Sequence, residues 1–185
     1  MRAFIALPIP PEAKGELVGI QAGIGARNKR LKIKWVEEYN LHVTVDFLGD
    51  VGDEQCPQAV GAMDAVCPGF RPFNLGFERI VAFPDLNRPH TLAVKIKDFE
   101  NTASEMHARL HSELIRRGFS LEDKNWAPHA TLGRIKSLPG GAVSLDKINI
   151  KAVRWQAEEV LLVKSELTPS GPRYETIHKI ILKGR

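Results

Sequence analysis

The sequence predicts an α+β fold of two lobes, each an antiparallel sheet with outer helices, around a central cleft that carries two His-x-Thr strands. Residues 40–49 and 128–133 share this His-x-Thr pattern between apolar residues, and both segments end on glycine. Because side chains alternate along a strand, each histidine shares one face with its threonine, and the apolar neighbours share the other. Both chain ends also read as strands, which favours one domain, residues 1–185, of two intertwined lobes.

The first elements are predicted from apolar runs and prolines. Residues 2–7 read as a buried strand that Pro8 stops. A helix is predicted over 12–24, because Glu12 suits its N-terminal dipole and leucine and isoleucine recur at helical spacing. Residues 31–36 alternate apolar and basic side chains, which is typical of a half-exposed strand that precedes the first motif.

The middle of the chain alternates extended and helical patterns. A helix is expected over 54–66, followed by an extended segment over 70–83 and a strand over 91–96. The strongest helical pattern covers 99–117, where apolar residues recur every three or four positions and a glycine follows. This helix leads through a loop into the second motif.

The C-terminal part is predicted as a hairpin. Residues 157–167 and 174–182 read as strands, and 168–172 read as the turn between them. Residues 136–141 are turn-like, whereas 142–153 carry no decisive pattern.

Composition indicates a soluble globular protein. Of the 185 residues, 43% are hydrophobic and 26% charged, and no apolar run approaches the roughly 20 residues that span a bilayer. Cys56 and Cys67 cannot form a disulfide framework or a four-ligand metal site, so we expect a cytoplasmic protein without membrane association. The formal charge of +4 and the pI of about 9.1 favour an anionic partner only weakly.

The polar faces of the motif strands carry groups suited to phosphate chemistry. Imidazole titrates near a pKa of about 6.5, so His42 and His129 can hold different protonation states at neutral pH. On opposite sides of a phosphate, one can take a proton from water while the other protonates the leaving oxygen. Thr44 and Thr131 can hydrogen-bond the phosphate oxygens without a metal ion. A strained 2′,3′-cyclic phosphate at an RNA end suits this arrangement best.

Strand alternation makes further predictions about faces. Asp46 shares the face of His42, where its carboxylate would repel phosphate unless it pairs with a cation, and Phe47 points into the core. Arg134 is an attractive phosphate or RNA contact, but its offset of five from His129 places it on the opposite face. Only a bulge or strand end near the preceding glycine would redirect it.

Other aromatic and histidine side chains are weaker candidates. Trp35, Trp126 and Tyr174 are candidates for stacking on bases. His107 and His111 have the four-residue spacing of metal ligands on a helix, but we interpret them as surface histidines and predict no metal site.

The two motifs resemble those of the 2H phosphoesterases, and more narrowly those of the LigT/ThpR branch of RNA 2′,3′-cyclic phosphodiesterases, once described as 2′-5′ RNA ligases. The opening strand at residues 2–7, the motif segments 41–49 and 128–134, and the ending at 164–175 are similar to that branch. The resemblance therefore covers nearly the whole chain.

The resemblance implies a role for each motif residue. His42 would donate a proton to the departing 3′ oxygen, His129 would accept a proton from water, and Thr44 and Thr131 would bind the phosphate. The product would be a 2′-phosphate end, formed by a bilobal monomer that needs no cofactor or metal. The partner would be RNA with a 2′,3′-cyclic phosphate end, with tRNA fragments among the candidates.

Two other functions stay open at this point. The same residues would serve the reverse reaction, in which a 5′-hydroxyl replaces water and forms a 2′-5′ linkage. Alternatively, the histidines would hold an RNA end without turnover, as a binding module for RNA ends or tRNA.

Overall fold

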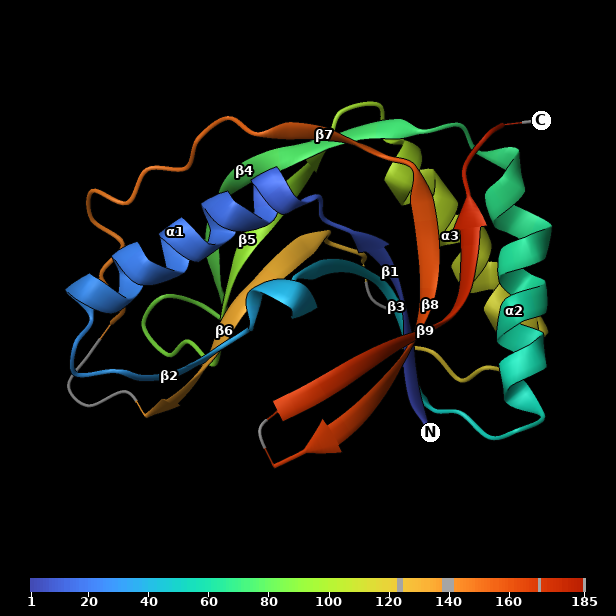
Figure 1. The fold of residues 1–185 in the computed structure, drawn as a ribbon, viewed down its shortest axis with the longest axis horizontal. Coiled ribbons are helices and arrows are strands. Elements are labelled where there is room, and N and C mark those ends of the chain that lie inside the picture. The colour runs from blue at the N-terminus through green and yellow to red at the C-terminus, as the bar shows by residue number, and fades with distance from the viewer. Residues whose placement is uncertain (123–124, 138–141, 170, 185) are drawn as a thin grey trace.

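The architecture is a curled antiparallel sheet with helices at both ends (Figure 1). The computed structural model describes residues 1–122, 125–137, 142–169 and 171–184. In this described part of the chain the strands are β1 (Arg2–Pro8), β2 (Lys32–Trp35), β3 (His42–Asp50), β4 (Phe73–Phe83), β5 (Thr91–Asp98), β6 (His129–Ser137), β7 (Arg154–Ala157), β8 (Glu159–Thr168) and β9 (Gly171–Ile181).

The strands run in the order β7-β4-β5-β6-β3-β1-β8-β9, and β2 pairs with β6. Every pairing is antiparallel. The predicted α+β class is thus confirmed, but the two expected sheets join through the β3–β6 pair, where Val43 lies opposite Ala130. The two motif strands therefore lie side by side at the junction of the two halves.

Three helices of the described residues cover the outer sides: α1 (Pro11–Arg27), α2 (Gln55–Val66) and α3 (Thr102–Arg116). All three were predicted, with bounds that differ by a few residues. α1 begins at a proline. Proline lacks a backbone N–H, but an N–H at the first position of a helix would have no acceptor within the helix. α3 begins at Thr102 rather than residue 99, because Asn101 before it has a φ of 58°.

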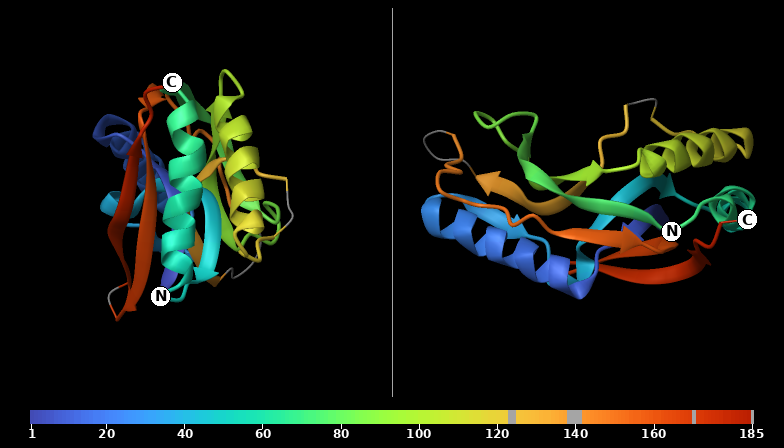
Figure 2. Two further views of the ribbon diagram at one scale, coloured as in Figure 1. Left: turned by 90° about the vertical axis from the view of Figure 1, so that its right-hand side faces the viewer. Right: turned by 90° about the horizontal axis from the view of Figure 1, so that it is seen from above.

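The helices sit at opposite ends of the molecule (Figure 2). α2 and α3 pack side by side, with α3 contacting β3 and α2 contacting β9, whereas α1 contacts β6. α1 follows β1 yet contacts β6 of the other half, and α3 contacts both β5, which precedes it in the chain, and β3. The chain thus passes between the two halves of the sheet more than once.

Most apolar side chains form one large core between the sheet and the helices. Of the apolar positions predicted for the helix over 99–117, Met106, Leu110 and Leu114 are fully enclosed in α3, whereas Phe99 precedes the helix and is 39% exposed. A second, smaller cluster of Phe4, Ala6 and Val163 lies on the other side of the β1–β8 pair and packs against Tyr174. Phe4 and Tyr174 of this group line the cavity described below.

The remaining predictions differ in detail. β7 at Arg154–Ala157 was missed, because its four residues adjoin the segment without a decisive pattern. Of the predicted turns, residues 138–141 and Ser170 lie outside the described residues, although Thr168 and Gly171 pair as the last residues of β8 and β9. None of the helices in the described part of the chain has both the length and the apolar character needed to cross a bilayer.

Candidate active site

The two motif strands bring their polar residues onto one face. Val43 of β3 lies opposite Ala130 of β6 in an antiparallel pair. One step in either direction therefore places His42 across from Thr131 and Thr44 across from His129. The four residues form a diagonal arrangement in which each histidine has its own threonine beside it and the other threonine across from it.

Both histidines are oriented by the same kind of hydrogen bond. Nδ1 of His42 donates to the carbonyl of Asn40 at 2.7 Å, and Nδ1 of His129 donates to the carbonyl of Ala127 at 2.8 Å. Each carbonyl lies two residues before its histidine. Because a carbonyl can only accept, the proton stays on Nδ1 and Nε2 becomes the atom that can exchange protons with a ligand. In His42, Nε2 lies 3.0 Å from the Thr44 hydroxyl.

Aromatic rings hold the His42 imidazole in place. It stacks on Phe4 with a centroid distance of 4.7 Å and meets Tyr174 edge-on at 5.5 Å. Burial lowers the pKa of His42; the hydrogen bond to Asn40 acts in the opposite direction, and the charges of Lys14 and His129 lower it further. The free protein therefore favours the neutral imidazole at this position.

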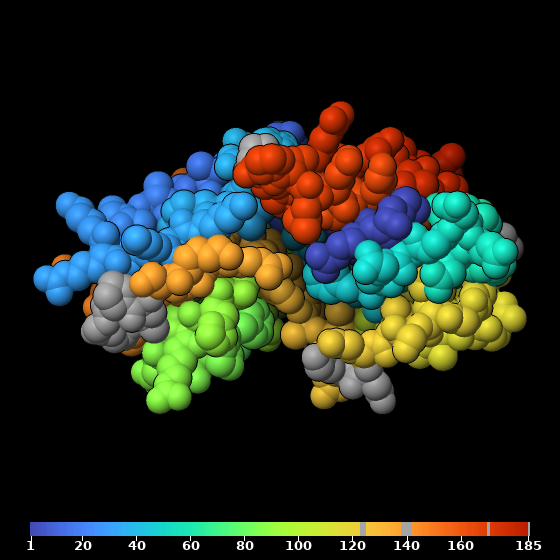
Figure 3. Space-filling model, turned by 90° about the horizontal axis from the view of Figure 1, so that it is seen from below, coloured from blue at the N-terminus to red at the C-terminus, as the bar shows by residue number. Residues whose placement is uncertain are grey.

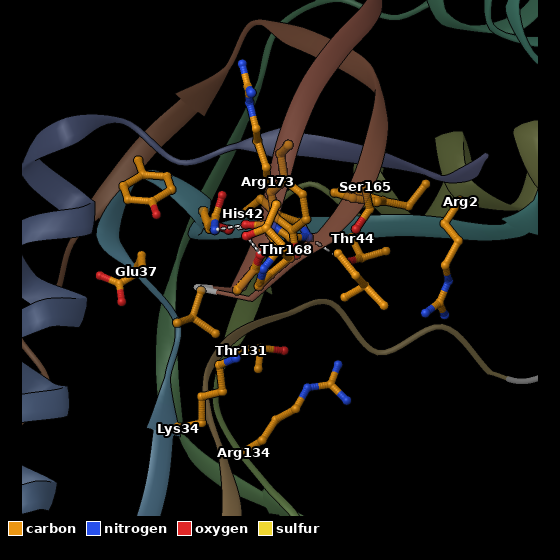
Figure 4. Close-up of a pocket in the computed structure, with 18 of the residues that line it drawn as sticks. Arg2, Lys34, Glu37, His42, Thr44, Thr131, Arg134, Ser165, Thr168 and Arg173 are labelled. Carbon is orange, nitrogen blue, oxygen red and sulfur yellow. Dashed lines mark hydrogen bonds between the residues drawn. The ribbon is translucent and has the colours of Figure 1, made fainter.

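A cavity of about 820 Å³ opens in front of His42. In Figure 3 the surface is hollowed where the β8–β9 hairpin (red) meets the segment around β2 (light blue) and β6 (orange). Thr44 and Thr131 line this cavity as predicted, and Figure 4 shows them close to His42. His129 is not part of the lining; its half-buried ring lies against Phe83, with a centroid distance of 5.1 Å.

The cavity is strongly basic. Among the described residues its lining contains one carboxylate, Glu37, and a larger group of cationic side chains: Arg2, Lys34, Arg134, Lys136 and Arg173. Figure 4 shows that Arg2, Lys34, Arg134 and Arg173 come from four different strands around the same space. The protein's modest overall charge therefore conceals a concentrated positive region that would attract a polyanion.

Two matching β-bulges change the faces predicted by alternation. In the β1–β3 pair, Ile5 lies opposite Asp46 and Ala6 opposite Thr44, so Val45 is an extra residue. In the β5–β6 pair, Leu92 lies opposite Gly133 and Ala93 opposite Thr131, which leaves Leu132 as the extra residue. A bulge reverses the parity of the residues after it.

These bulges correct the predictions for Phe47 and Asp46, and they supply the redirection that the candidate contact Arg134 required. Phe47 was expected in the core, but it is 68% exposed and lines the cavity. Asp46 was expected beside His42, but it is buried against α3, away from the cavity lining. Arg134, which strict alternation placed on the opposite face, lines the cavity because the bulge redirects it.

The aromatic candidates separate into two groups. Trp35 and Tyr174 line the cavity. Trp126 does not: its indole N–H donates to the Thr44 carbonyl at 3.0 Å, and its ring stacks on His107 at 4.9 Å. Trp126 thus supports the first motif strand from behind instead of facing the cavity.

The interpretation of His107 and His111 as surface histidines is wrong. Their side chains are only 13% and 17% exposed, and both face the buried carboxylate of Asp46. Nδ1 of His111 lies 2.9 Å from Oδ1 of Asp46. The sequence signal was the four-residue spacing on a helix, but its carboxylate partner is 61 residues away from His107 along the chain.

Several cavity residues were missed by sequence reasoning. Phe4 supports His42 and Arg173 adds a cation, yet neither lies near a motif in the sequence. A signal for Phe4 exists only in the strand pairing, which sets it opposite Phe47. Arg173 is brought to the cavity by the β8–β9 hairpin, which begins far from the motifs in the chain.

Comparison with known proteins finds one family pattern twice along this chain. A family model described as LigT like Phosphoesterase matches residues 7–93 and, a second time, residues 94–174. Each match contains one His-x-Thr motif, so the two halves of the site correspond to two copies of one family pattern.

Two curated relatives illustrate matches over nearly the full length of both chains. The RNA 2′,3′-cyclic phosphodiesterase of Methanocaldococcus jannaschii is 31% identical over 181 residues, which cover 96% of this chain and 98% of that protein. The protein of the same name from Thermotoga maritima is 27% identical over 190 residues, covering 100% of this chain and 97% of that one.

Solved structures share the fold. The crystal structure of TT0787 of Thermus thermophilus superimposes with a TM-score of 0.85 at 28% identity, covering 100% of this chain and 99% of that one. Escherichia coli LigT complexed with 3′-AMP gives a TM-score of 0.77 over 98% of this chain and 97% of that one, and at 19% identity it supports the fold alone. The two family matches and the full-length similarity show that this chain belongs to the LigT-like phosphoesterase family.

Proposed function

We propose that this protein hydrolyses 2′,3′-cyclic phosphate ends of RNA to 2′-phosphates by paired-histidine acid–base catalysis. The observation that carries the proposal is the matched orientation of His42 and His129, whose Nδ1 atoms are both tied to backbone carbonyls beside a basic cavity. Curated relatives of this chain are named RNA 2′,3′-cyclic phosphodiesterase, which supports the choice of substrate.

In the proposed reaction the cyclic phosphate sits between the two Nε2 atoms. Nε2 of His129 accepts a proton from a water molecule, whose oxygen forms a new bond to phosphorus. The bond from phosphorus to the 3′ oxygen breaks, and Nε2–H of His42 protonates that oxygen as it leaves. The product is a 2′-phosphate with a free 3′-hydroxyl. Thr44 and Thr131 would donate hydrogen bonds to the non-bridging oxygens.

The donor role of His42 requires a protonated imidazole. Burial lowers its pKa in the free protein, which opposes protonation. A phosphate anion beside the ring has the opposite effect, because a nearby negative charge favours the charged form of histidine. We therefore propose that His42 becomes protonated when the substrate phosphate binds beside it. The Thr44 hydroxyl at 3.0 Å can accept from Nε2–H when that proton is present.

The cavity also fits a nucleic-acid ligand. The basic lining would contact the backbone phosphates that precede the cyclic end, and exposed rings such as Phe47 would stack on a base. A tRNA-derived substrate and a monomeric state belong to the same proposal. A cytoplasmic location does too, and it is consistent with the free thiols of Cys56 and Cys67.

The test is a product analysis of the purified protein in EDTA, with a nucleoside 2′,3′-cyclic phosphate and with a short RNA that ends in one. We expect a 2′-phosphate product, and we expect His42→Ala and His129→Ala each to lower turnover by about 10²–10⁴-fold. His178→Ala is the matched control, because His178 pairs with Asp64 outside the cavity lining.

The other outcomes are equally informative. A 3′-phosphate product would keep the two histidines but reverse the leaving oxygen. Tight binding of the RNA with no product after long incubation would replace the proposed enzyme with a binding module for RNA ends. Full activity in either single-histidine variant would contradict the paired mechanism.

A further inference from the structure

Behind the first motif strand, three side chains with metal-binding atoms converge on one point. Asp46 projects from β3, and His107 and His111 project from α3 at a spacing of four residues, so both rings lie on one side of the helix. Oδ1 of Asp46 lies 2.9 Å from Nδ1 of His111 and 3.6 Å from Nε2 of His107. The ring centroids of the two histidines are 5.3 Å apart.

A second observation shows that this cluster is incompletely satisfied. Oδ2 of Asp46 is buried and accepts no hydrogen bond from any described residue. The Asp46 side chain is only 9% exposed. A buried carboxylate oxygen without a partner costs free energy that a cation at this position would offset. The two histidines therefore leave Oδ2 of Asp46 without a partner among the described residues.

We propose that Asp46, His107 and His111 bind a divalent transition-metal ion, with zinc as the best match. Their ligand atoms all lie within 4.8 Å of one another. Ligand atoms on a tetrahedral zinc, at about 2.0–2.2 Å from the metal, lie roughly 3.3–3.6 Å apart, so small side-chain shifts would suffice. Two imidazoles and one carboxylate suit zinc far better than magnesium or calcium, which prefer oxygen ligands.

The fourth coordination position would hold water. The two histidines are 13% and 17% exposed, so the cluster is reached from solvent on their side. None of the three ligands lines the basic cavity. The site is therefore separate from the proposed catalytic residues, and the inference does not depend on the proposed reaction.

The ion would tie α3 to the first motif strand. Asp46 lies two residues after Thr44, directly beyond the bulge at Val45. The ring of His107 stacks on Trp126, whose indole N–H donates to the Thr44 carbonyl. A metal ion at this point would fix both Asp46 and Trp126, the two contacts that hold this part of β3 from behind. We assign it a structural role.

The test is zinc binding to the full chain after treatment with EDTA and removal of the chelator. Titration calorimetry should show a saturable site for one Zn²⁺ ion, and Co²⁺ should give the visible absorption of a tetrahedral complex. We expect His107→Ala and Asp46→Asn each to weaken zinc binding by at least about 100-fold. Loss of a residue that only supports a ligand costs up to about 100-fold in affinity, and loss of the ligand itself should cost at least as much. His178→Ala, which removes the histidine of a His–Asp pair at the same 2.9 Å distance, should bind zinc as the unchanged protein does.

Further variants separate this site from other ligands. His42→Ala and Cys56→Ser should retain the tight site, because neither residue belongs to the cluster. Zn²⁺ should raise the midpoint of thermal unfolding of the unchanged protein but not of His107→Ala, and circular dichroism checks that each variant is folded. Absence of a saturable site, or a zinc affinity in His107→Ala and Asp46→Asn equal to that of the unchanged protein, would overturn the proposal and leave a hydrogen-bonded triad without metal.

Discussion

Phe47 and Arg134 occupy equivalent positions on the two motif strands, and both line the basic cavity. Each lies five residues after the histidine of its strand and two residues after the extra residue of a bulge. One position carries an exposed ring and the other a cation. The two halves of the site thus have the same backbone geometry but different side chains for recognition. This asymmetry predicts separate effects of substitution at the two positions.

Phe47→Ala should weaken the binding of an RNA end with little effect on folding. Stacking of a base on an aromatic ring contributes about 1–3 kcal/mol, so we expect KM for a short cyclic-phosphate RNA to rise by roughly 5-fold to 150-fold. Because Phe47 is 68% exposed, its removal should leave the thermal midpoint nearly unchanged. Ile115→Ala, at a 50% exposed position on α3 outside the cavity lining, is the control. An unchanged KM would exclude stacking at Phe47.

Arg134→Ala should reduce the dependence of RNA binding on salt. If Arg134 contacts one phosphate, its loss should lower the slope of log K against log salt concentration by about 0.7, the value for a contact to a single strand. The measurement is a binding titration at several salt concentrations. Arg79→Ala removes an exposed arginine outside the cavity lining and should leave the slope unchanged. Equal slopes for both variants would show that Arg134 does not contact phosphate.

Lys14→Met should raise the pKa of His42. Burial is the main reason that this pKa lies below the ordinary value of 6.5, and the Lys14 charge contributes in the same direction. Without that charge the protonated imidazole is less disfavoured, so NMR titration of the His42 ring should give a higher pKa than in the unchanged protein. A pKa that stays the same or falls would contradict the electrostatic coupling.

The pH dependence of kcat/KM in the same variant distinguishes the two possible roles of His42. The profile of kcat/KM reports the pKa of the free enzyme, and the contribution of a proton donor is lost as the pH rises through that pKa, so a higher pKa would move the alkaline limb to higher pH. A proton acceptor must be neutral, so if His42 had that role, the acidic limb of the profile would move to higher pH instead. Our assignment of His42 as donor predicts the first result.

Gly133→Ala should destabilise the contact between β2 and β6. A Cβ atom at this position would lie 2.8 Å from the Trp35 ring and 3.1 Å from the Lys34 carbonyl. Such overpacking costs about 1–3 kcal/mol, or roughly 2–12 °C in the thermal midpoint of a chain of this size.

Gly15→Ala is the matched control for this substitution. Nothing lies within 4 Å of a Cβ atom at position 15, which is inside α1. Alanine there should stabilise the protein by about 0.5–1 kcal/mol, because it restricts the unfolded chain and favours the helix. Destabilisation of equal size in both variants would show that the close approach at Gly133 is unimportant.

Local sequence patterns determined the helices, most of the strands and the pairing of each histidine with a threonine. These features depend on periodicity within a few residues, and the buried positions of α3 follow from that periodicity. The shared face of each histidine and its own threonine follows from strand alternation, whereas the placement of His42 across from Thr131 and of Thr44 across from His129 depends on the β3–β6 pairing.

Only the tertiary structure decided which residues surround the motifs. The bulges at Val45 and Leu132 depend on pairing with β1 and β5, and they moved Phe47 and Arg134 into the cavity and Asp46 out of it. The Asp46 carboxylate meets His107 and His111 because α3 packs behind β3. Alternation along a strand cannot predict such contacts, since one extra residue in the pairing reverses every face that follows.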